Sequence, residues 1–255
     1  MRFACLGSGS EGNGLLVEVD STRVLVDCGF GVRDTVARLA RIGVAAETVA
    51  GIVVTHEHSD HIGGVAAFAA RFGTPVWLTF GTLSVVAERF ARLDRVYGFD
   101  SHDRFAVGAI EIRPFPVPHD AREPVQFVCS DGNWRLGVLT DLGTSTAFVE
   151  SSLSGCDALV LECNHDIDML ANGDYPYPLK QRIAGKFGHL DNAAAAGLLA
   201  KIDTSRLKHL IAAHLSQHNN RPELARAALA ASLGCSADWI GIADQQHGFG
   251  WREFI

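Results

Sequence analysis

The chain has 255 residues and a formal net charge of −7, and 47% of its residues are hydrophobic and 20% charged. This length is enough for a buried core in one large domain or two small ones, the composition excludes a disordered chain, and the negative charge excludes binding of nucleic acid through bulk positive charge. No apolar run is long enough to span a membrane, and the first residues lack the apolar run of a signal peptide, so we expect a cytoplasmic protein without membrane contacts.

Short strands separated by turns are predicted for the first half of the chain. Apolar runs predict strands over residues 2–7, 15–20, 23–29, 51–55 and 75–80. Helices are expected over residues 61–73 and over residues 32–43, where Val32, Val36 and Leu39 share one face. A glycine-rich turn over residues 7–14 separates the first two strands.

The second half of the chain repeats this pattern. Strands are predicted over residues 109–117, 124–131, 133–141, 156–163, 207–214 and 248–255, the second and third forming a hairpin. Helices are predicted over residues 190–202, with Asp191 as N-cap, and over residues 221–234, with Pro222 in the first turn. Two strand-rich halves with helices predict an α/β (α+β) fold in which two sheets pack together with helices outside, and we treat residues 1–255 as a single domain.

Cysteine and histidine are the residue types that bear most directly on chemistry. The six cysteines form no Cys-x-x-Cys pair and have mostly apolar neighbours, so we expect reduced core residues rather than disulfides or metal ligands. The chain also has 11 histidines, and several stand in short motifs with Asp, Asn or Ser. We therefore expect the functional residues among the histidine motifs.

The segment from His56 to His61 reads His-Glu-His-Ser-Asp-His and links a buried strand to a helix. In an extended stretch, side chains two residues apart point to the same side, so His56 and His58 can bind one metal ion. Asp60 and His61, at the start of the helix, can face a second ion about 3.5–4 Å from the first, as in two-metal hydrolases. The segment therefore predicts a centre for two metal ions.

Four further candidate ligands each close an apolar strand: Asp27, His119, Asp141 and His214. Taken singly, an Asp at such a place is as consistent with a turn, and a His with a partly buried core position. Together with the segment 56–61, they predict a site that one edge of two packed sheets brings together.

The segment Thr-His-Glu-His-Ser-Asp-His-Ile-Gly-Gly, residues 55–64, resembles the His-x-His-x-Asp-His signature of the metallo-β-lactamase fold superfamily, and the four strand-end residues follow in the family's order. The resemblance covers essentially the whole chain and implies a four-layer αββα sandwich with two metal ions at one edge. It implies these roles: His56, His58 and His119 hold one ion; Asp60, His61 and His214 hold the second; Asp141 bridges them; and Asp27 orients the histidines.

Narrower features resemble the YycJ/WalJ-like group, which comprises metal-dependent hydrolases with 5′→3′ DNA exonuclease activity. These features are the segments 6–14, 114–121, 159–166, 188–196 and 213–220. The last three also run parallel to segments of ribonuclease Z. The resemblance implies a phosphodiesterase, specifically a nuclease that acts on DNA ends through a metal-bridged hydroxide, with two divalent ions that can be Zn²⁺, Mn²⁺ or Fe²⁺.

The late motifs add candidates for catalysis and substrate binding. Gly188-His189 precedes a helix N-cap, and helix N-termini attract phosphate, so His189 can donate to a substrate phosphate. His165 lies near where ribonuclease Z places its proton-shuttling histidine, so Asp60 or His165 can assist proton transfer. Candidates for phosphate contacts are Asn164, Ser216, Asn219 and Asn220, and candidates for stacking on or pairing with a nucleic-acid strand are Tyr175, Tyr177, Lys180 and Arg182.

Other functions fit the same metal site. A thioesterase or lactonase of the glyoxalase II type needs no groups that bind phosphate, whereas a phosphodiesterase acting on a small cyclic molecule needs them. A metal-bearing scaffold without activity is less consistent with the sequence, because every ligand of the family pattern is present. A flavin-partnered di-iron oxidoreductase has a carboxylate ligand within the motif, whereas Glu57 points away if His56 and His58 point into the site.

Overall fold

Two mixed sheets form the centre of the structure, a computed structural model that describes residues 1–254. Within these residues the first sheet has the order β14 (Phe249–Glu253), β1 (Arg2–Gly7), β2 (Gly14–Val19), β3 (Thr22–Val26), β4 (Gly51–Val53), β5 (Val76–Thr79) and β6 (Val96–Phe99). The second sheet has the order β13 (Gly241–Ile242), β12 (His209–Ala213), β11 (Ala158–Glu162), β10 (Arg135–Leu139), β9 (Val125–Ser130), β8 (Ile110–Pro116) and β7 (Phe105–Val107).

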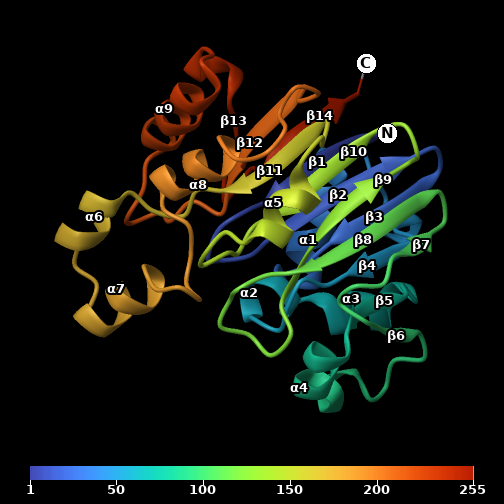
Figure 1. The fold of residues 1–255 in the computed structure, drawn as a ribbon. Helices are drawn as coiled ribbons and strands as arrows, with labels where there is room; N and C mark the ends of the chain where they lie inside the picture. The colour runs from blue at the N-terminus through green and yellow to red at the C-terminus, as the bar shows by residue number, and fades with distance from the viewer. Residues whose placement is uncertain (255) are drawn as a thin grey trace.

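Each sheet is built from one half of the chain, apart from β14, which returns to pair with β1 (Figure 1). The predicted hairpin is confirmed, because β9 and β10 pair antiparallel around the turn at residues 131–134. The predicted closing strand is confirmed as β14, and its last predicted residue, Ile255, lies outside the described residues.

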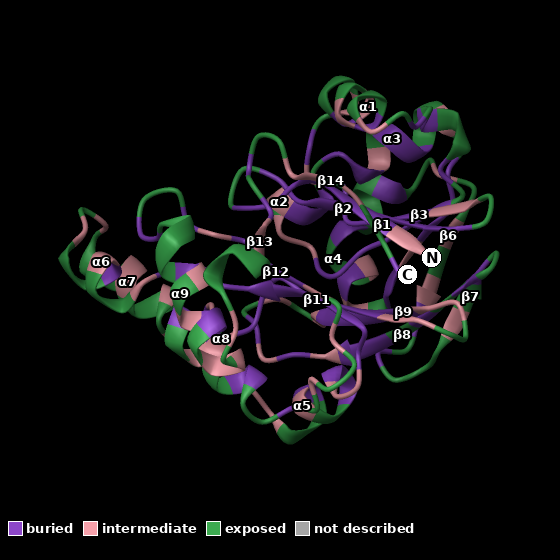
Figure 2. Cartoon of the chain, turned by 90° about the horizontal axis from the view of Figure 1, so that it is seen from above, coloured by how far each residue is buried: buried purple, intermediate pink, exposed green. Residues whose placement is uncertain are grey.

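Helices cover the outer face of each sheet and give the structure four layers (Figure 2). The helices α1 (Val32–Arg41), α3 (Val65–Phe72) and α4 (Phe80–Phe90) pack on the first sheet, and α5 (Ala147–Leu153), α8 (Asn192–Leu199) and α9 (Pro222–Leu233) pack on the second. The αββα sandwich expected from the sequence is thus confirmed. The shorter helical segments are η1 (Ala46–Thr48), α2 (Ser59–Ile62), α6 (Ile167–Asn172), α7 (Tyr177–Ile183) and η2 (Ala237–Trp239).

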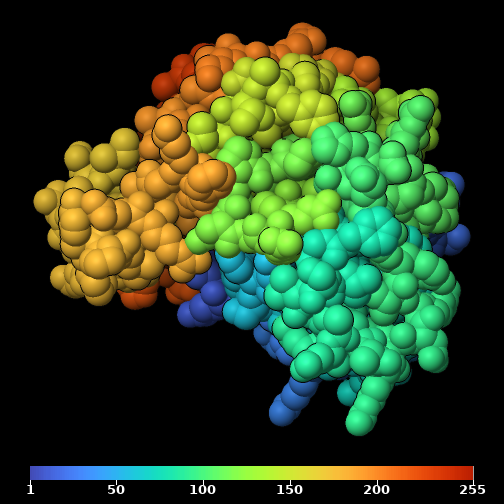
Figure 3. All heavy atoms as spheres, turned by 60° about the horizontal axis from the view of Figure 1, so that its bottom comes forward, coloured from blue at the N-terminus to red at the C-terminus, as the bar shows by residue number. Residues whose placement is uncertain are grey.

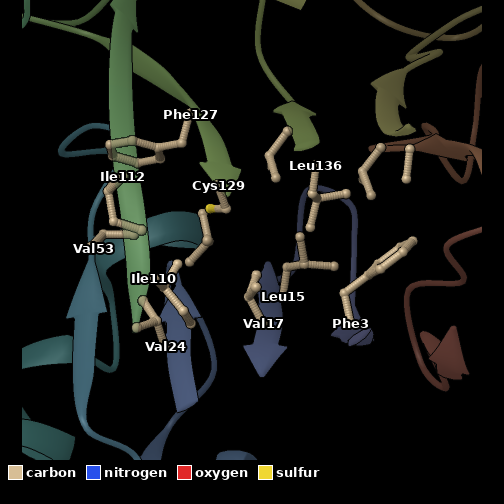
Figure 4. Close-up of a cluster of buried hydrophobic side chains, with 14 of the residues drawn as sticks. Phe3, Leu15, Val17, Val24, Val53, Ile110, Ile112, Phe127, Cys129 and Leu136 are labelled. Carbon is tan, nitrogen blue, oxygen red and sulfur yellow. The ribbon is translucent and has the colours of Figure 1, made fainter. Parts of the chain in front are cut away.

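The central core lies between the two sheets (Figure 4). Phe3, Leu15 and Val17 of the first sheet belong to the same buried cluster as Phe127 of the second. Leu16 belongs instead to the cluster beneath the helices, because successive side chains of a strand point to opposite faces. A third buried cluster lies between the second sheet and its helices. Since burying a large apolar side chain contributes about 1.5–3 kcal/mol, these three clusters hold the layers together.

The helix predicted over residues 61–73 is divided in the structure. Gly63 and Gly64 separate α2 from α3. A Cβ atom on Gly64 would lie 1.8 Å from the carbonyl oxygen of Phe30, so this position has no room for a side chain. The break leaves α2 as a single turn that carries Asp60 and His61 to the edge of the sandwich.

Four helices are absent from the sequence-based expectations, namely α4, α5, α6 and α7. The strand predicted over residues 75–80 ends at Thr79, whose hydroxyl accepts a hydrogen bond from the backbone of Thr82 and caps α4. Because α4 is rich in β-branched and aromatic residues, its composition resembles that of a strand. The helix α7 begins after Pro176 and carries Pro178 in its first turn, so its sequence resembles a loop.

The structure also bears on two expectations drawn from composition. Five of the six cysteines are buried and Cys235 is half-buried, as expected for core residues. Within residues 1–254 no helix is long and apolar enough to cross a membrane. The cytoplasmic location stays a prediction.

Candidate metal centre

The candidate ligands converge at one edge of the sandwich, where strands of both sheets end. Asp27 and His214 directly follow β3 and β12, whereas His56, His119 and Asp141 lie just beyond the ends of β4, β8 and β10. Within each sheet these strands run in the same direction, so their carboxyl ends share an edge. The structure therefore brings together residues that are far apart in the sequence, as the strand-end pattern predicted.

One candidate ligand set consists of His56, His58 and His119. Nε2 of His56 lies 3.0 Å from Nδ1 of His58, which in turn lies 3.3 Å from Nε2 of His119. Nitrogens bound to one Zn²⁺ at about 2.0–2.1 Å in tetrahedral geometry are about 3.3 Å apart, so the three side chains fit a shared ion. The ring of His119 is held by its Nδ1, which lies 3.0 Å from the carbonyl oxygen of Gly188.

Glu57, between two of these histidines, points away from the site, as predicted. Its carboxylate accepts a hydrogen bond of 2.6 Å from the backbone N–H of Arg122 and one of 3.3 Å from the hydroxyl of Thr82. The motif thus contains one carboxylate inside the site, Asp60, and one outside it.

A second ligand set consists of Asp60, His61 and His214. Oδ2 of Asp60 lies 3.3 Å from Nε2 of His61 and 3.4 Å from Nε2 of His214. Asp141 reaches both sets, because its Oδ2 lies 3.1 Å from Nε2 of His61 and its Oδ1 lies 3.7 Å from Nε2 of His119.

Asp141 also shows that this donor set fits metal ions. Its Oδ2 atom is buried and forms no hydrogen bond with any of the described residues. A buried carboxylate oxygen without a partner is costly, and a divalent cation between this oxygen and the surrounding imidazoles would remove that cost. The residues present therefore fit two divalent ions.

Asp27, which accepts a hydrogen bond from Thr55, orients the second ligand set through Nδ1 of His61. Oδ2 of Asp27 lies 2.8 Å from Nδ1 of His61 and accepts a hydrogen bond of 2.8 Å from the hydroxyl of Thr55. With Nδ1 engaged in this way, His61 presents Nε2 to the carboxylates of the site. Asp27 and His214 have φ angles of 61° and 54°, a left-handed backbone that costs a non-glycine residue about 1–3 kcal/mol. Two of the three non-glycine residues with a positive φ among the described residues therefore lie at the site, and the third, Asp20, lies in the turn between β2 and β3.

The glycine-rich turn after β1 contacts the same ligand set and holds it in place. Nδ2 of Asn13 lies 3.1 Å from Nε2 of His61 and 3.4 Å from Oδ2 of Asp60. The hydroxyl of Ser8 donates to Oδ1 of Asn13 and accepts a hydrogen bond from the backbone N–H of His214, both at 3.0 Å. The turn thus ties the ends of β1 and β12 to the centre.

Burial and nearby charges shift the pKa values of the site in opposite directions. Burial lowers the pKa of His56 well below 6.5, and the neighbouring His61 adds to the effect. Burial also lowers the pKa of His214, but Asp141 and the hydrogen bond to Asp60 outweigh it and raise the value to about 10. Burial raises the pKa of Asp141, yet His214 and His61 lower it well below 3.8. His56 and Asp141 are thus already in the forms that bind metals, whereas His214 must release a proton.

A buried glutamate that the sequence analysis missed adjoins the second set. Glu162, the last residue of β11, has no exposed surface, and its Oε1 lies 2.7 Å from Nδ1 of His189 and 3.6 Å from Nδ1 of His214. Its Oε2 accepts hydrogen bonds of 2.8 and 3.1 Å from the backbone N–H groups of Leu142 and Leu190. Its signal in the sequence is the one that found the other ligands, a charged residue that closes an apolar strand.

A pocket of about 380 Å³ is lined by His58 of the first ligand set, by Asp60 and His214 of the second, and by Asp141. Tyr175, Leu179, Arg182 and Ile183 also line this pocket. Arg182 is the only Lys or Arg among the described residues that line the pocket, and its Nε lies 2.6 Å from Oδ2 of Asp120. In Figure 3 the gold residues around α6 and α7 form a lobe at the left edge of the molecule. This lobe supplies the only fixed positive charge of the described pocket lining.

The four predicted phosphate contacts, Asn164, Ser216, Asn219 and Asn220, are buried, and none is among the described residues that line this pocket. Asn164 donates a hydrogen bond of 3.0 Å to the carbonyl oxygen of His214, and Asn220 donates one of 2.7 Å to that of Cys163. The hydroxyl of Ser216 accepts a hydrogen bond of 3.1 Å from the backbone N–H of Asn219. These side chains therefore stabilise the backbone around His214, a candidate metal ligand.

His165 also lies apart from this pocket, which we call the metal pocket. Its side chain is 2% exposed and lines a second hollow, between α6 and α7. Its predicted role in proton transfer gains no support from this position. His189, in contrast, lines the metal pocket together with Asp60, and its role as a donor to a substrate phosphate stays a prediction.

Comparisons with known proteins identify relatives of the chain. Residues 22–214 match the β-lactamase superfamily domain. The chain is 36% identical over 249 residues to the exodeoxyribonuclease YycJ of Bacillus anthracis, covering 97% of this chain and 94% of that protein. It is 31% identical over 247 residues to the exodeoxyribonuclease WalJ of Streptococcus pneumoniae, covering 94% of this chain and 91% of that protein. Among solved structures, the metallo-β-lactamase fold protein YhfI from Bacillus subtilis superposes with a TM-score of 0.78 over 99% of both chains, at 17% identity.

Proposed function

The chain belongs to the β-lactamase superfamily, within it to the family of the YycJ and WalJ proteins, and is a metal-dependent hydrolase; we propose that it is an exonuclease that removes nucleotides from DNA ends. The relatives named exodeoxyribonuclease match almost the whole chain. One structural observation carries the proposal: the buried carboxylate of Asp141 reaches both ligand sets in a pocket that His189 also lines. Two ions that share a pocket in this way suit phosphodiester cleavage.

We propose that the two ligand sets hold two divalent ions, with Asp141 shared between them. Mixed sites of imidazole and carboxylate accept Zn²⁺, Mn²⁺ or Fe²⁺. When bound, such ions lower the pKa of water and neutralise charge on a phosphoryl group. Asp27 supports this arrangement by fixing the ring of His61.

The chain's own side chains bind the substrate and move protons. Glu162 occupies Nδ1 of His189, so Nε2 is the nitrogen that can donate to a substrate phosphate. Burial lowers the pKa of His189, but the charge and hydrogen bond of Glu162 outweigh it and raise the value above 6.5, which favours a protonated donor. The carboxylate of Asp60 is 20% exposed and lines the same pocket, where it can accept a proton from the attacking water. Arg182, paired with Asp120, is the fixed positive charge of the described pocket lining.

Linear and covalently closed circular duplex DNA of the same sequence test the proposal. The protein is stripped of metal, supplied with Mn²⁺ or Zn²⁺, and assayed for release of mononucleotides. We expect release from the linear form only, and a fall of roughly 100-fold or more for Asp60→Asn. Glu57→Gln is the matched control, because its carboxylate lies outside the site. Hydrolysis of a glutathione thioester by a protein that leaves linear DNA intact would overturn the proposal in favour of a thioesterase.

A further inference from the structure

A second hollow lies on the other side of α7 from the metal pocket. Its volume is about 490 Å³, within the range of small-molecule sites. The residues of α7 divide between the two cavities: Leu179, Arg182 and Ile183 line the metal pocket, and Tyr177, Lys180, Gln181 and the following Ala184 line the hollow. One helix is therefore the common wall of both cavities, and a ligand in the hollow lies next to the metal pocket.

The rim of the hollow is apolar and aromatic. Ile167 is 55% exposed and Tyr177 is 71% exposed, so both side chains offer apolar surface beside the hollow. The phenol of Tyr177 accepts a hydrogen bond of 2.8 Å from Nε2 of Gln181, which fixes the ring beside the opening. Leu170 lines the hollow and is 3% exposed. A held aromatic ring over an apolar floor is suited to stacking of a flat group.

His165 lines the hollow with an unused polar atom. The residue is 2% exposed, and its Nδ1 has no hydrogen-bond partner among the described residues. Its backbone is fixed, because the carbonyl oxygen accepts a hydrogen bond of 2.9 Å from Asn192 at the start of α8. Leaving a buried polar atom without a partner costs about 1–3 kcal/mol, so a ligand whose binding turns the imidazole and pairs this nitrogen would bind more tightly.

The charge of the surrounding segment indicates an anionic ligand. The chain as a whole has a net charge of −7. The segment from Tyr175 to His189, which includes α7, contains Lys180, Arg182 and Lys186 and no acidic residue. Lys180 lines the hollow, as does Asp191, and Arg182 lines the metal pocket, where it pairs with Asp120. Since Arg182 is already paired, Lys180 is the side chain of α7 that suits a phosphate of a nucleic-acid strand.

We propose that the hollow binds the base of a nucleotide close to the one being cleaved, while the strand crosses α7 between the two cavities. This inference rests on the proposed function. The ring of Tyr177 stacks on the base, Nδ1 of His165 pairs with a polar atom of its edge, and Lys180 neutralises a phosphate outside. The hollow thereby holds the strand so that its end lies in the metal pocket.

Single-stranded oligonucleotides that lack one base at successive positions test this proposal. With the wild-type protein, removal of the base that occupies the hollow slows cleavage by roughly 5- to 100-fold, as expected for one stacked base, and other positions have smaller effects. In Ala184→Trp the indole fills the hollow, so this dependence on position is lost. Ala227→Trp, at an exposed alanine of α9, is the matched control and keeps it. Rates are normalised to the turnover of bis(p-nitrophenyl) phosphate, which has no base. A flat profile in the wild type, or an unchanged profile in Ala184→Trp, would overturn the proposal.

A direct binding experiment separates this proposal from the proposed function. A dinucleotide that contains 2-aminopurine is titrated with the metal-loaded protein, and its fluorescence is followed. Quenching by the wild type and Ala227→Trp but not by Tyr177→Ala or Ala184→Trp supports base binding even if DNA is not cleaved. Absence of quenching overturns it. Binding of an apolar dye to the wild type but not to Ala184→Trp, without quenching of the dinucleotide, also overturns it, because the hollow would then receive an apolar partner.

Discussion

Nδ1 of His189 lies 2.7 Å from Oε1 of Glu162, whose side chain has no exposed surface. Two backbone N–H groups hold the other carboxylate oxygen, so the pair is fixed from the protein side. A carboxylate behind an imidazole sets its tautomer and its orientation. The ring of His189 therefore faces the pocket in one defined way.

Replacing Glu162 by Gln tests this pairing. We expect kcat to fall by about 10- to 100-fold, because His189 loses its orienting charge, while KM changes little. Steady-state kinetics on a phosphodiester substrate and metal content by plasma mass spectrometry measure the effect. Because Glu162 also lies near His214, in a group of side chains that could hold an ion, loss of bound metal together with activity would contradict a role confined to orienting His189.

Removal of metal tests the donor sets. Ions that bind only the folded protein stabilise it by about 3–4 kcal/mol when their free concentration is roughly 100 to 1,000 times Kd. We expect a chelator to lower Tm and Mn²⁺ or Zn²⁺ to restore it. Asp141→Asn should show a much smaller difference, because this carboxylate reaches both sets. Identical melting of the wild type with and without chelator would contradict the assignment.

The close approach at Gly64 predicts a large effect of a small change. A Cβ atom there would lie 1.8 Å from the carbonyl oxygen of Phe30, so Gly64→Ala should lower the free energy of unfolding by about 1–3 kcal/mol. Gly197 lies inside α8 with nothing near its Cβ position, so Gly197→Ala should raise it by about 0.5–1 kcal/mol. Urea unfolding measures both. An unchanged stability of Gly64→Ala would show that α2 is not held as described.

The ion pairs of Glu18 lead us to predict that the free energy of unfolding falls in acid. Its carboxylate accepts hydrogen bonds of 2.6 Å from Arg2 and 2.5 Å from Arg23. Burial raises the pKa of Glu18, but these two arginines outweigh it and lower the value below 4.5. Because the pKa of Glu18 is lower in the folded than in the unfolded chain, its ion pairs contribute fully to stability above the unfolded-state pKa. This contribution is lost as the pH falls through the folded-state pKa.

The variant Glu18→Gln isolates this contribution. Near pH 7 we expect it to be about 1–2 kcal/mol less stable than the wild type, because the arginines are partly exposed. The difference should shrink as the pH falls below about 4.5, the ordinary pKa of a glutamate. Urea unfolding of both proteins between pH 7 and pH 3 gives the curve. A difference that stays constant over this range would rule out the charge as its source.

The sequence located most of the site because strand ends carry a simple signal. Asp27, Asp141 and His214 are polar residues that follow apolar runs, and parallel strands bring such ends together. Glu162 obeys the same rule, but a single glutamate before a turn does not stand out from ordinary surface carboxylates. Its burial becomes evident only once β10 and β12 lie on both sides of β11.

The polar residues around the late motifs show what the sequence leaves open. Asn164, Asn220 and Ser216 have side chains suited to phosphate, yet each is hydrogen-bonded to the protein backbone, in one case 57 residues away, and Asn220 also pairs with the side chain of Asn192. Where backbone segments pass one another in the interior, their buried polar groups need such hydrogen bonds. The sequence does not show which segments do so. The helix α7 was missed for a related reason, because its prolines resemble those of a loop while its position between two cavities depends on tertiary structure.

The central claim is that two ions held by this site cleave DNA from an end. The most direct measurement is digestion of one linear duplex labelled at either its 5′ or its 3′ ends, with metal-free protein, with protein supplied with Mn²⁺ or Zn²⁺, and with Asp60→Asn. We predict that the 5′ label appears as mononucleotide at the earliest times, only with metal and not with the variant. Full-length DNA that persists while both ions are shown to be bound would contradict the account.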